Sequence, residues 1–180
     1  LAEVEREFVE GYAILRDLFG LQHVPAFTPP WHRFHPGYAG LLRLSGTIAI
    51  SLIGPRPAAA VAGMKIVNVH ASPIAWTEPP GFVSDETYLQ PILEHLRGRR
   101  EGRFAPDEAT GIVTHHLVQN ARSHEFLARL VDIVDEHAAA RWLDVREIIG
   151  IAREQAVAAV PAQARPLPAV LISFNRGPML

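Results

Sequence analysis

The stretch GIVTHHLV, Gly111 to Val118, decides the fold class, because it joins an apolar β-branched run to two adjacent histidines. Ile112 and Val113 are typical of a strand that is buried in a parallel sheet. Successive side chains of a strand point to opposite faces, so His115 and His116 are not expected to face one site. We expect one of them to be a site residue that exchanges protons near neutral pH, and the other to be bonded to backbone. The alternative is two structural histidines at a strand end.

Helical and strand patterns alternate around this stretch. Apolar periodicity predicts helices over residues 3–18, 38–44, 85–96, 123–137 and 144–160, and strands over 23–27, 47–51, 65–70 and 111–116. Short apolar strands that alternate with helices indicate an α/β fold with a mostly parallel, buried sheet. Residues 169–180 form one more strand-like run, and periodicity leaves open whether it joins the sheet.

Two of the predicted helices carry more specific expectations. Ser123 is a suitable N-cap for the helix over 123–137. The apolar side of the helix over 85–96 is expected to consist of Leu89, Ile92, Leu93 and Leu96.

Functional residues in α/β folds collect in the loops that follow the carboxyl ends of strands. Here those loops cover residues 28–33, 51–57, 70–76 and 115–116, and they are rich in His, Trp, Arg and Pro. Trp31 and Trp76 each offer a flat apolar face on which a sugar ring can stack, although a packed loop aromatic is the alternative for both. The loops therefore predict a ligand site at this edge of the sheet.

Composition excludes several classes of function. The 180 residues carry a formal net charge of −2, so no electrostatic footprint for nucleic acid exists. The absence of cysteine excludes disulfides, thiolate nucleophiles and zinc sites of the cysteine type. No apolar window is long enough for a membrane span, and the acidic amino-terminal stretch is unlike a signal peptide. We expect a cytoplasmic protein.

Four segments in the same order resemble the carboxyl-terminal part of the polysaccharide deacetylase family, also called carbohydrate esterase family 4. They are TPPWHR (28–33), VNVHASPIAW (67–76), GIVTHHLV (111–118) and AARWLDVREI (139–148). The closest likeness is to a divergent bacterial branch of that family. The resemblance covers roughly residues 1–148. Residues 149–180 are expected to form a helix extension, a linker rich in Pro and Ala, and a strand-like tail.

The resemblance implies a partial (β/α) barrel and the metal-dependent removal of acetyl groups from N-acetylated oligo- or polysaccharides. It implies a divalent metal, usually zinc, held by an Asp and two His, with a second Asp as the general base and a His as the general acid. His115 falls on the general-acid position, and His116 is the second choice. The substrate-binding residues that the resemblance implies are Pro30, Trp31, Arg33 and Trp76.

This sequence also departs from the family pattern. The Arg that orients the base falls on Thr28, with Arg33 as the nearest substitute, and two acidic positions before Trp76 fall on Ser72 and Ala75. The motifs with the metal ligands do not appear, so no metal ligand is assigned here. They are expected upstream, in agreement with the missing initiator Met, and such a partial barrel would leave open strand edges that favour association.

The departures keep two other interpretations open. The first is a non-catalytic carbohydrate-binding or structural domain derived from the same fold. The second is an unrelated α/β domain in which the histidines and tryptophans at the strand ends only pack.

Overall fold

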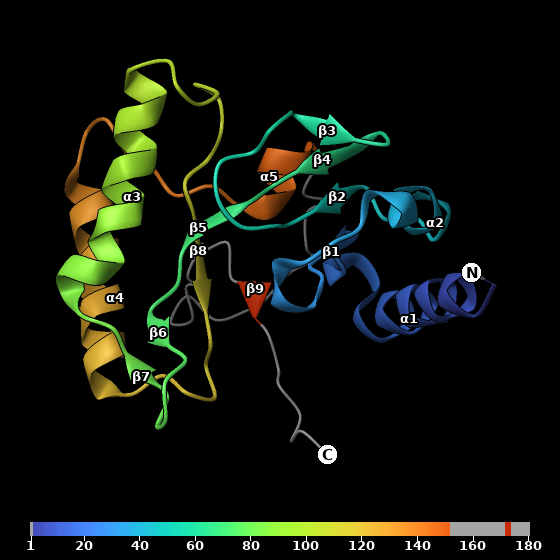
Figure 1. The fold of residues 1–180 in the computed structure, drawn as a ribbon, viewed down its shortest axis with the longest axis horizontal. Helices are drawn as coiled ribbons and strands as arrows, with labels where there is room; N and C mark the ends of the chain where they lie inside the picture. Colours follow the sequence, from blue (N-terminus) through green and yellow to red (C-terminus); the bar gives the residue numbers. More distant parts are fainter. Residues whose placement is uncertain (1, 152–171, 174–180) are drawn as a thin grey trace. The chain divides into compact units, whose positions relative to one another are not determined.

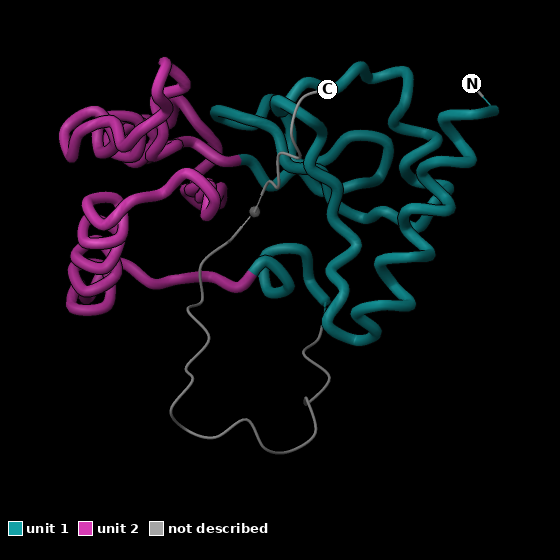
Figure 2. The backbone as a smooth tube through the Cα atoms, turned by 90° about the horizontal axis from the view of Figure 1, so that it is seen from below, with its two compact units in different colours: residues 1–68, 145–165 teal, residues 69–144, 166–180 magenta. Residues whose placement is uncertain are grey.

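The computed structural model describes residues 2–151 and 172–173 (Figure 1). The chain divides into two compact units, which Figure 2 shows in different colours. Unit 1 comprises residues 1–68 and 145–165, and unit 2 comprises residues 69–144 and 166–180. Each unit has its own sheet and its own apolar core, so the two are described in turn.

Unit 1 joins a four-stranded sheet to helices. Its α-helices are α1 (Ala2–Phe19), α2 (Ala39–Leu44) and α5 (Val145–Ile149), and its short 3-10 helices are η1 (Gly20–Gln22), η2 (Pro30–His32) and η3 (Pro36–Tyr38). Its strands are β1 (Ala26–Phe27), β2 (Ala49–Ile50), β3 (Ala60–Val61) and β4 (Met64–Ile66), in the order β1-β2-β4-β3. β1, β2 and β4 run parallel, whereas β3 and β4 form an antiparallel hairpin.

The sheet of unit 1 buries apolar side chains on both faces. One cluster contains Leu42, Ile50 and Met64, and the other contains Ala49 and Ile149. Burial on both faces explains why β2 reads as a continuous apolar run rather than an alternating one. The removal of these side chains from water supplies the main stabilisation of the unit.

Unit 2 contains two long helices and two small sheets. The helices are α3 (Asp85–Arg100) and α4 (Ala121–Glu136). β5 (Val69–Ala71), β8 (Gly111–Thr114) and β9 (Ile172–Ser173) form a parallel sheet in the order β5-β8-β9, and β6 (Ile74–Ala75) pairs antiparallel with β7 (Gly81–Phe82). In Figure 1, α3 and α4 lie together on one side of the β5–β8 pair. Tyr88 of α3 and Phe126 of α4 pack edge to face at 5.1 Å between ring centroids.

Side-chain caps begin both long helices of unit 2. The Ser84 side chain accepts a hydrogen bond from the Thr87 N–H at the start of α3. Asn120 caps α4 by accepting from the Ser123 N–H, and the Ser123 hydroxyl accepts from the Asn120 N–H. Such a reciprocal pair satisfies two helix-end donors at once. The prediction that Ser123 is the N-cap was therefore wrong by three residues.

The α/β class and the mostly parallel pairing are confirmed, because four of the described strand pairs run parallel. The strands form three separate small sheets, and the described residues form no closed barrel. The predicted strand over 65–70 is in fact β4 and β5, separated by Val67 and Asn68. Asn68 leaves the ladder because its side chain accepts from the Leu52 N–H and donates to the Gly54 carbonyl.

Other expectations were wrong at their boundaries. The segments between the predicted strands 47–51 and 65–70, and between the latter and the predicted helix 85–96, were expected to be irregular but contain β3, β6 and β7. The strand-like tail joins the sheet through β9, which pairs with Val113 and Thr114 of β8. The helix expected over 144–160 is α5 within the described residues, and residues 152–160 lie outside them. Among the described helices, none is both long and apolar enough to cross a membrane.

Candidate functional site

Trp76 and His115 are far apart in the sequence but meet in unit 2. Trp76 directly follows β6, and His115 directly follows β8. Their ring centroids are 4.9 Å apart, and the ring planes are nearly perpendicular at 87°. Trp76 keeps 46% of its surface exposed, and His115 is half-buried. The pair therefore presents an apolar ring beside a titratable one at the surface.

The end of β8 sets the position of His115. All four residues of β8 are buried, and the strand ends at Thr114 rather than at His116. The His115 carbonyl accepts hydrogen bonds from the N–H groups of Val118 and Gln119 at 2.9 and 3.1 Å, which closes a turn. His116 is exposed in that turn. The strand predicted over 111–116 therefore ends two residues earlier than expected, and neither histidine belongs to it. The alternation of side chains along a strand does not apply to this pair.

The other predicted site residues lie in unit 1. Pro30 and Trp31 belong to η2, and Arg33 follows it. All three are exposed. Trp31 and His32 adopt positive φ angles of 58° and 55°, an uncommon conformation for residues other than glycine. The common groove predicted for Trp31 and Trp76 stays a prediction.

A second constellation, which the sequence did not reveal, is buried in unit 2. His70 on β5, His95 on α3 and Glu108 in the loop before β8 converge there. The His70 Nε2 lies 3.3 Å from Glu108 Oε1, and the His95 Nε2 lies 3.3 Å from Glu108 Oε2. The three side chains are only 2–3% exposed. The two imidazoles stack with 3.6 Å between their centroids. We call these three residues the His-Glu-His cluster.

The outer nitrogen of each imidazole also has a partner. The Gly111 N–H donates to His70 Nδ1 at 3.0 Å. His95 Nδ1 lies 2.9 Å from the Thr110 hydroxyl oxygen. Gly111 begins β8, so His70 links β5 to the strand that leads to His115.

Aromatic packing closes the cluster on one side. The Phe104 ring stacks on His95 with 5.6 Å between centroids, and the Arg103 guanidinium lies 5.2 Å above the Phe104 ring. Gly98 of α3 leaves the space that Phe104 occupies, because a Cβ at residue 98 would overlap its ring. Glycine is therefore required in the last turn of the helix, although its backbone is less favourable there than that of alanine.

We expect the change Gly98→Ala to destabilise the protein by about 1–3 kcal/mol, because the added methyl group must displace the Phe104 ring from the cluster. The control is Gly11→Ala in α1, where nothing outside the adjoining residues and the helix backbone lies within 4 Å of the added Cβ. That change should stabilise the protein by about 0.5–1 kcal/mol, the usual gain of alanine in a helix. Urea unfolding of the three proteins measures both effects. Equal gains from the two changes would contradict this packing.

Burial governs the charge of the cluster. Burial and the neighbouring His95 lower the pKa of His70 to about 4, although Glu108 opposes the change. Burial also lowers the pKa of His95, again against the influence of Glu108. Both imidazoles are therefore neutral at neutral pH, and each carries a proton on only one nitrogen.

The donor types of the cluster are those that zinc takes: two imidazole nitrogens and a carboxylate oxygen. The hydrogen bonds argue against a metal. A neutral imidazole that binds a metal through Nε2 carries its proton on Nδ1 and donates it to an acceptor. His70 Nδ1 instead accepts the Gly111 N–H, so the proton of the neutral ring is on Nε2, which faces Glu108. As arranged, the cluster does not fit the metal that the resemblance implies.

One sequence signal could have revealed the cluster. Tyr88 and His95 are seven positions apart on α3, so they share a helix face, and both are buried together with Gly98. The predicted apolar side was shifted, because Leu93 and Leu96 are 45% and 41% exposed. A histidine on the buried face was the available sign, but nothing in the sequence linked it to Glu108 or His70.

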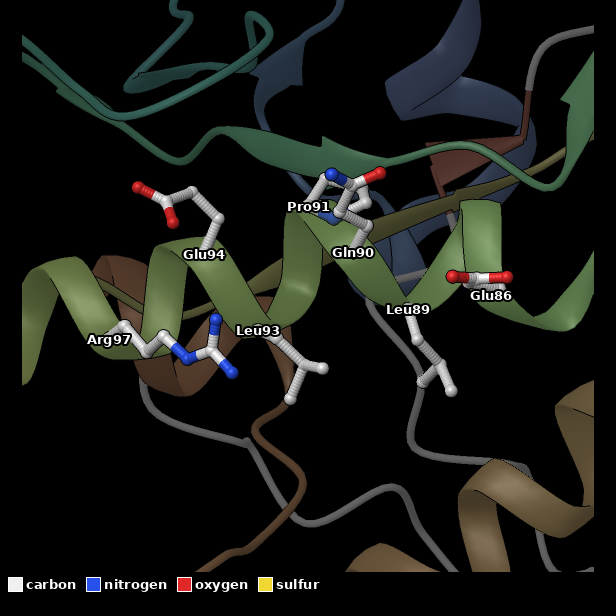
Figure 3. Close-up of a pocket in the computed structure, with 7 residues that line it drawn as sticks. All are labelled: Glu86, Leu89, Gln90, Pro91, Leu93, Glu94 and Arg97. Atoms are coloured by element: carbon white, nitrogen blue, oxygen red, sulfur yellow. The ribbon is translucent and has the colours of Figure 1, made fainter.

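A surface hollow of unit 2 lies apart from these side chains. Among the described residues it is lined by Glu86, Leu89, Gln90, Pro91, Leu93, Glu94 and Arg97, all from α3 (Figure 3). The lining includes no residue of the His-Glu-His cluster and neither Trp76 nor His115. Side chains from a single helix do not make a set of convergent catalytic groups.

Comparisons of the chain with models of known protein families, with curated proteins and with solved structures found no match. The class of the chain therefore rests on its fold, a mixed α/β arrangement with small, mostly parallel sheets. Its function is a matter for proposal from the residues themselves.

Proposed function

We propose that the chain acts on N-acetylated carbohydrates, with Trp76 as the stacking platform and His115 as the proton donor in amide hydrolysis. The contact between these two rings, at 4.9 Å, supports the proposal more than any other observation. Their places at the ends of predicted strands indicated a ligand site, and the family resemblance implied that the ligand is an N-acetylated sugar. Their contact brings the two rings together at the surface of unit 2, as a shared site requires.

The two rings suit different parts of an N-acetylated sugar. An indole face that remains 46% exposed accommodates the apolar face of a pyranose ring. An imidazole at its edge can bond the acetamido group and, when protonated, give its proton to the leaving nitrogen. In that step water attacks the carbonyl carbon, the C–N bond breaks, and the products are acetate and the free amine. No described residue is assigned here to the activation of the water.

The second candidate is sugar binding without hydrolysis. Ser72 and Ala75 stand four residues and one residue before Trp76, where the family that this sequence resembles carries acidic residues. Neither side chain can act as a general base. This observation favours a binding domain in which the stacking function is kept and the chemistry is lost.

We expect the change Trp76→Ala to weaken the binding of tetramers of N-acetylglucosamine at least tenfold, because stacked aromatic contact area dominates such sites. Isothermal titration of the 180-residue chain measures the affinity. The control is Ile133→Ala, which removes an exposed apolar side chain, 62% exposed against 46% for Trp76, from α4 of the same unit. Unchanged affinity after Trp76→Ala would contradict the proposal.

The His115→Gln variant separates the two candidates. If the chain is a hydrolase, the variant should still bind the tetramer but release acetate at least a hundredfold more slowly, because the proton donor is lost. Acetate release from wild-type protein and from His116→Gln gives the comparison. Binding by the wild-type chain without any acetate release would favour the binding domain.

A further inference from the structure

We propose that the His-Glu-His cluster is a metal-free carboxylate clamp, in which the Glu108 carboxylate accepts hydrogen bonds from the Nε2–H groups of both His70 and His95. The clamp thereby fixes the register of β8. His70, His95 and Glu108 are then positioning residues for His115. Only this last role rests on the proposed function. The clamp itself concerns protonation states that can be measured without any substrate.

The state of His70 follows from its hydrogen bond to the backbone. An N–H group can only donate, so the nitrogen that faces the Gly111 N–H must carry a lone pair. That nitrogen is Nδ1, so the proton of the neutral ring is on Nε2. Nε2 lies 3.3 Å from Glu108 Oε1, a close contact that falls short of full hydrogen-bond geometry, and no described residue forms a hydrogen bond with Nε2.

His95 has more freedom than His70. Its Nδ1 faces a hydroxyl, which can donate or accept, so the Thr110 contact at 2.9 Å fits either tautomer. The carboxylate decides between them, because Glu108 Oε2 lies 3.3 Å from Nε2 and can only accept when ionised. The Thr110 hydroxyl then donates to Nδ1.

The stacked rings therefore offer two N–H groups side by side to one carboxylate. Each oxygen faces one imidazole at 3.3 Å, somewhat longer than the usual N–H···O distance of about 2.9 Å. The arrangement resembles the fork that an arginine presents to a carboxylate, but it is built from two neutral rings. Such a fork satisfies a buried carboxylate without a counter-charge on either ring.

The clamp lies where β5 and β8 change register. Val69 pairs with Gly111 and Ala71 pairs with Ile112, so His70 is an extra residue on β5, as in a β-bulge. At this irregularity the Gly111 N–H donates to the His70 side chain instead of to a strand carbonyl. Because Gly111 and His115 lie at either end of the same short run, the clamp sets where His115 emerges.

Nitrogen NMR of the imidazoles tests the clamp in the 180-residue chain. At pH 7 both His70 and His95 should show a protonated Nε2 and an unprotonated Nδ1. In Glu108→Gln, the amide can accept from one ring but must donate to the other. His70 is held by Gly111, so only His95 should change, moving its proton to Nδ1 and donating it to Thr110.

Glu94→Gln, an exposed position on α3, serves as the control and should change neither ring. A proton on His70 Nδ1 in the wild type would overturn the proposal, and this result does not require the variant to fold. The proposal would also be overturned if zinc added to the wild type bound at one ion per chain and displaced the Nε2 proton of His70 or His95. A failure of sugar binding with the expected tautomers would overturn the proposed function and leave the clamp standing.

Discussion

The replacement of Glu108 by alanine should destabilise the protein by about 3–5 kcal/mol, which is the usual cost of removing one partner of a buried interaction that involves an ionisable group. The carboxylate is 3% exposed and lies within 3.3 Å of two buried imidazole nitrogens. Without it, the Nε2–H of His70 and the Nε2 atom of His95, whichever tautomer His95 adopts, are left buried with no partner, and each unsatisfied group costs about 1–3 kcal/mol. Urea unfolding followed by circular dichroism measures the loss.

Glu94→Ala is the matched control for this experiment. Glu94 is also a glutamate, but it is exposed and forms an ion pair with Arg103 at 2.8 Å. Exposed pairs contribute little, so the unfolding midpoint should hardly change. A similar small effect from Glu108→Ala would show that the cluster is not a source of stability.

Acid should destabilise the protein in a window set by His70, whose pKa burial lowers from 6.5 to about 4. Between pH 6.5 and pH 4, His70 is protonated in the unfolded chain but not in the folded chain. Its contribution to stability therefore falls as the pH falls, and it levels off near pH 4. One pKa unit corresponds to about 1.4 kcal/mol of folding free energy, and residual solvent access reduces the effect of His70 on stability to about 2–3 kcal/mol. The lowered pKa of His95 acts in the same direction.

Urea unfolding between pH 8 and pH 4 measures this dependence. His70→Gln removes this titrating ring and should make the curve less steep between pH 6.5 and pH 5, and the slope that remains comes from the other histidines with lowered pKa values, His95 among them. A stability that stays constant or rises as the pH falls through this window in the wild type would contradict the buried, neutral state of His70.

The sequence predicted the class of the fold because its signals are local. The β-branched run ending at Thr114 and the amphipathic pattern of α4 each arise within one element, and both elements were found. Trp76 and His115 were also predicted as site residues, since both follow strands and loops after strands collect functional groups. Their contact is consistent with that reasoning.

The His-Glu-His cluster could not be predicted, because it depends on register rather than on pattern. His70, His95 and Glu108 come from a strand, a helix and a loop with no fixed spacing. The β-bulge at His70 and the break of the strand at Asn68 both arise from side chains that bind backbone groups, which periodicity does not show. The N-cap of α4 was misplaced for the same reason, since Asn120 and Ser123 are both good capping residues.

The binding of an N-acetylated sugar at Trp76 and His115 is the central claim, and an NMR titration tests it most directly. The chain has three tryptophans, and Trp142 packs against the core cluster of unit 2, so its indole signal is an internal control. With tetramers of N-acetylglucosamine, we expect saturable shifts of the Trp76 indole and the His115 imidazole signals, and no shift of Trp142. Saturating amounts of sugar that leave the Trp76 and His115 signals unmoved would contradict the account.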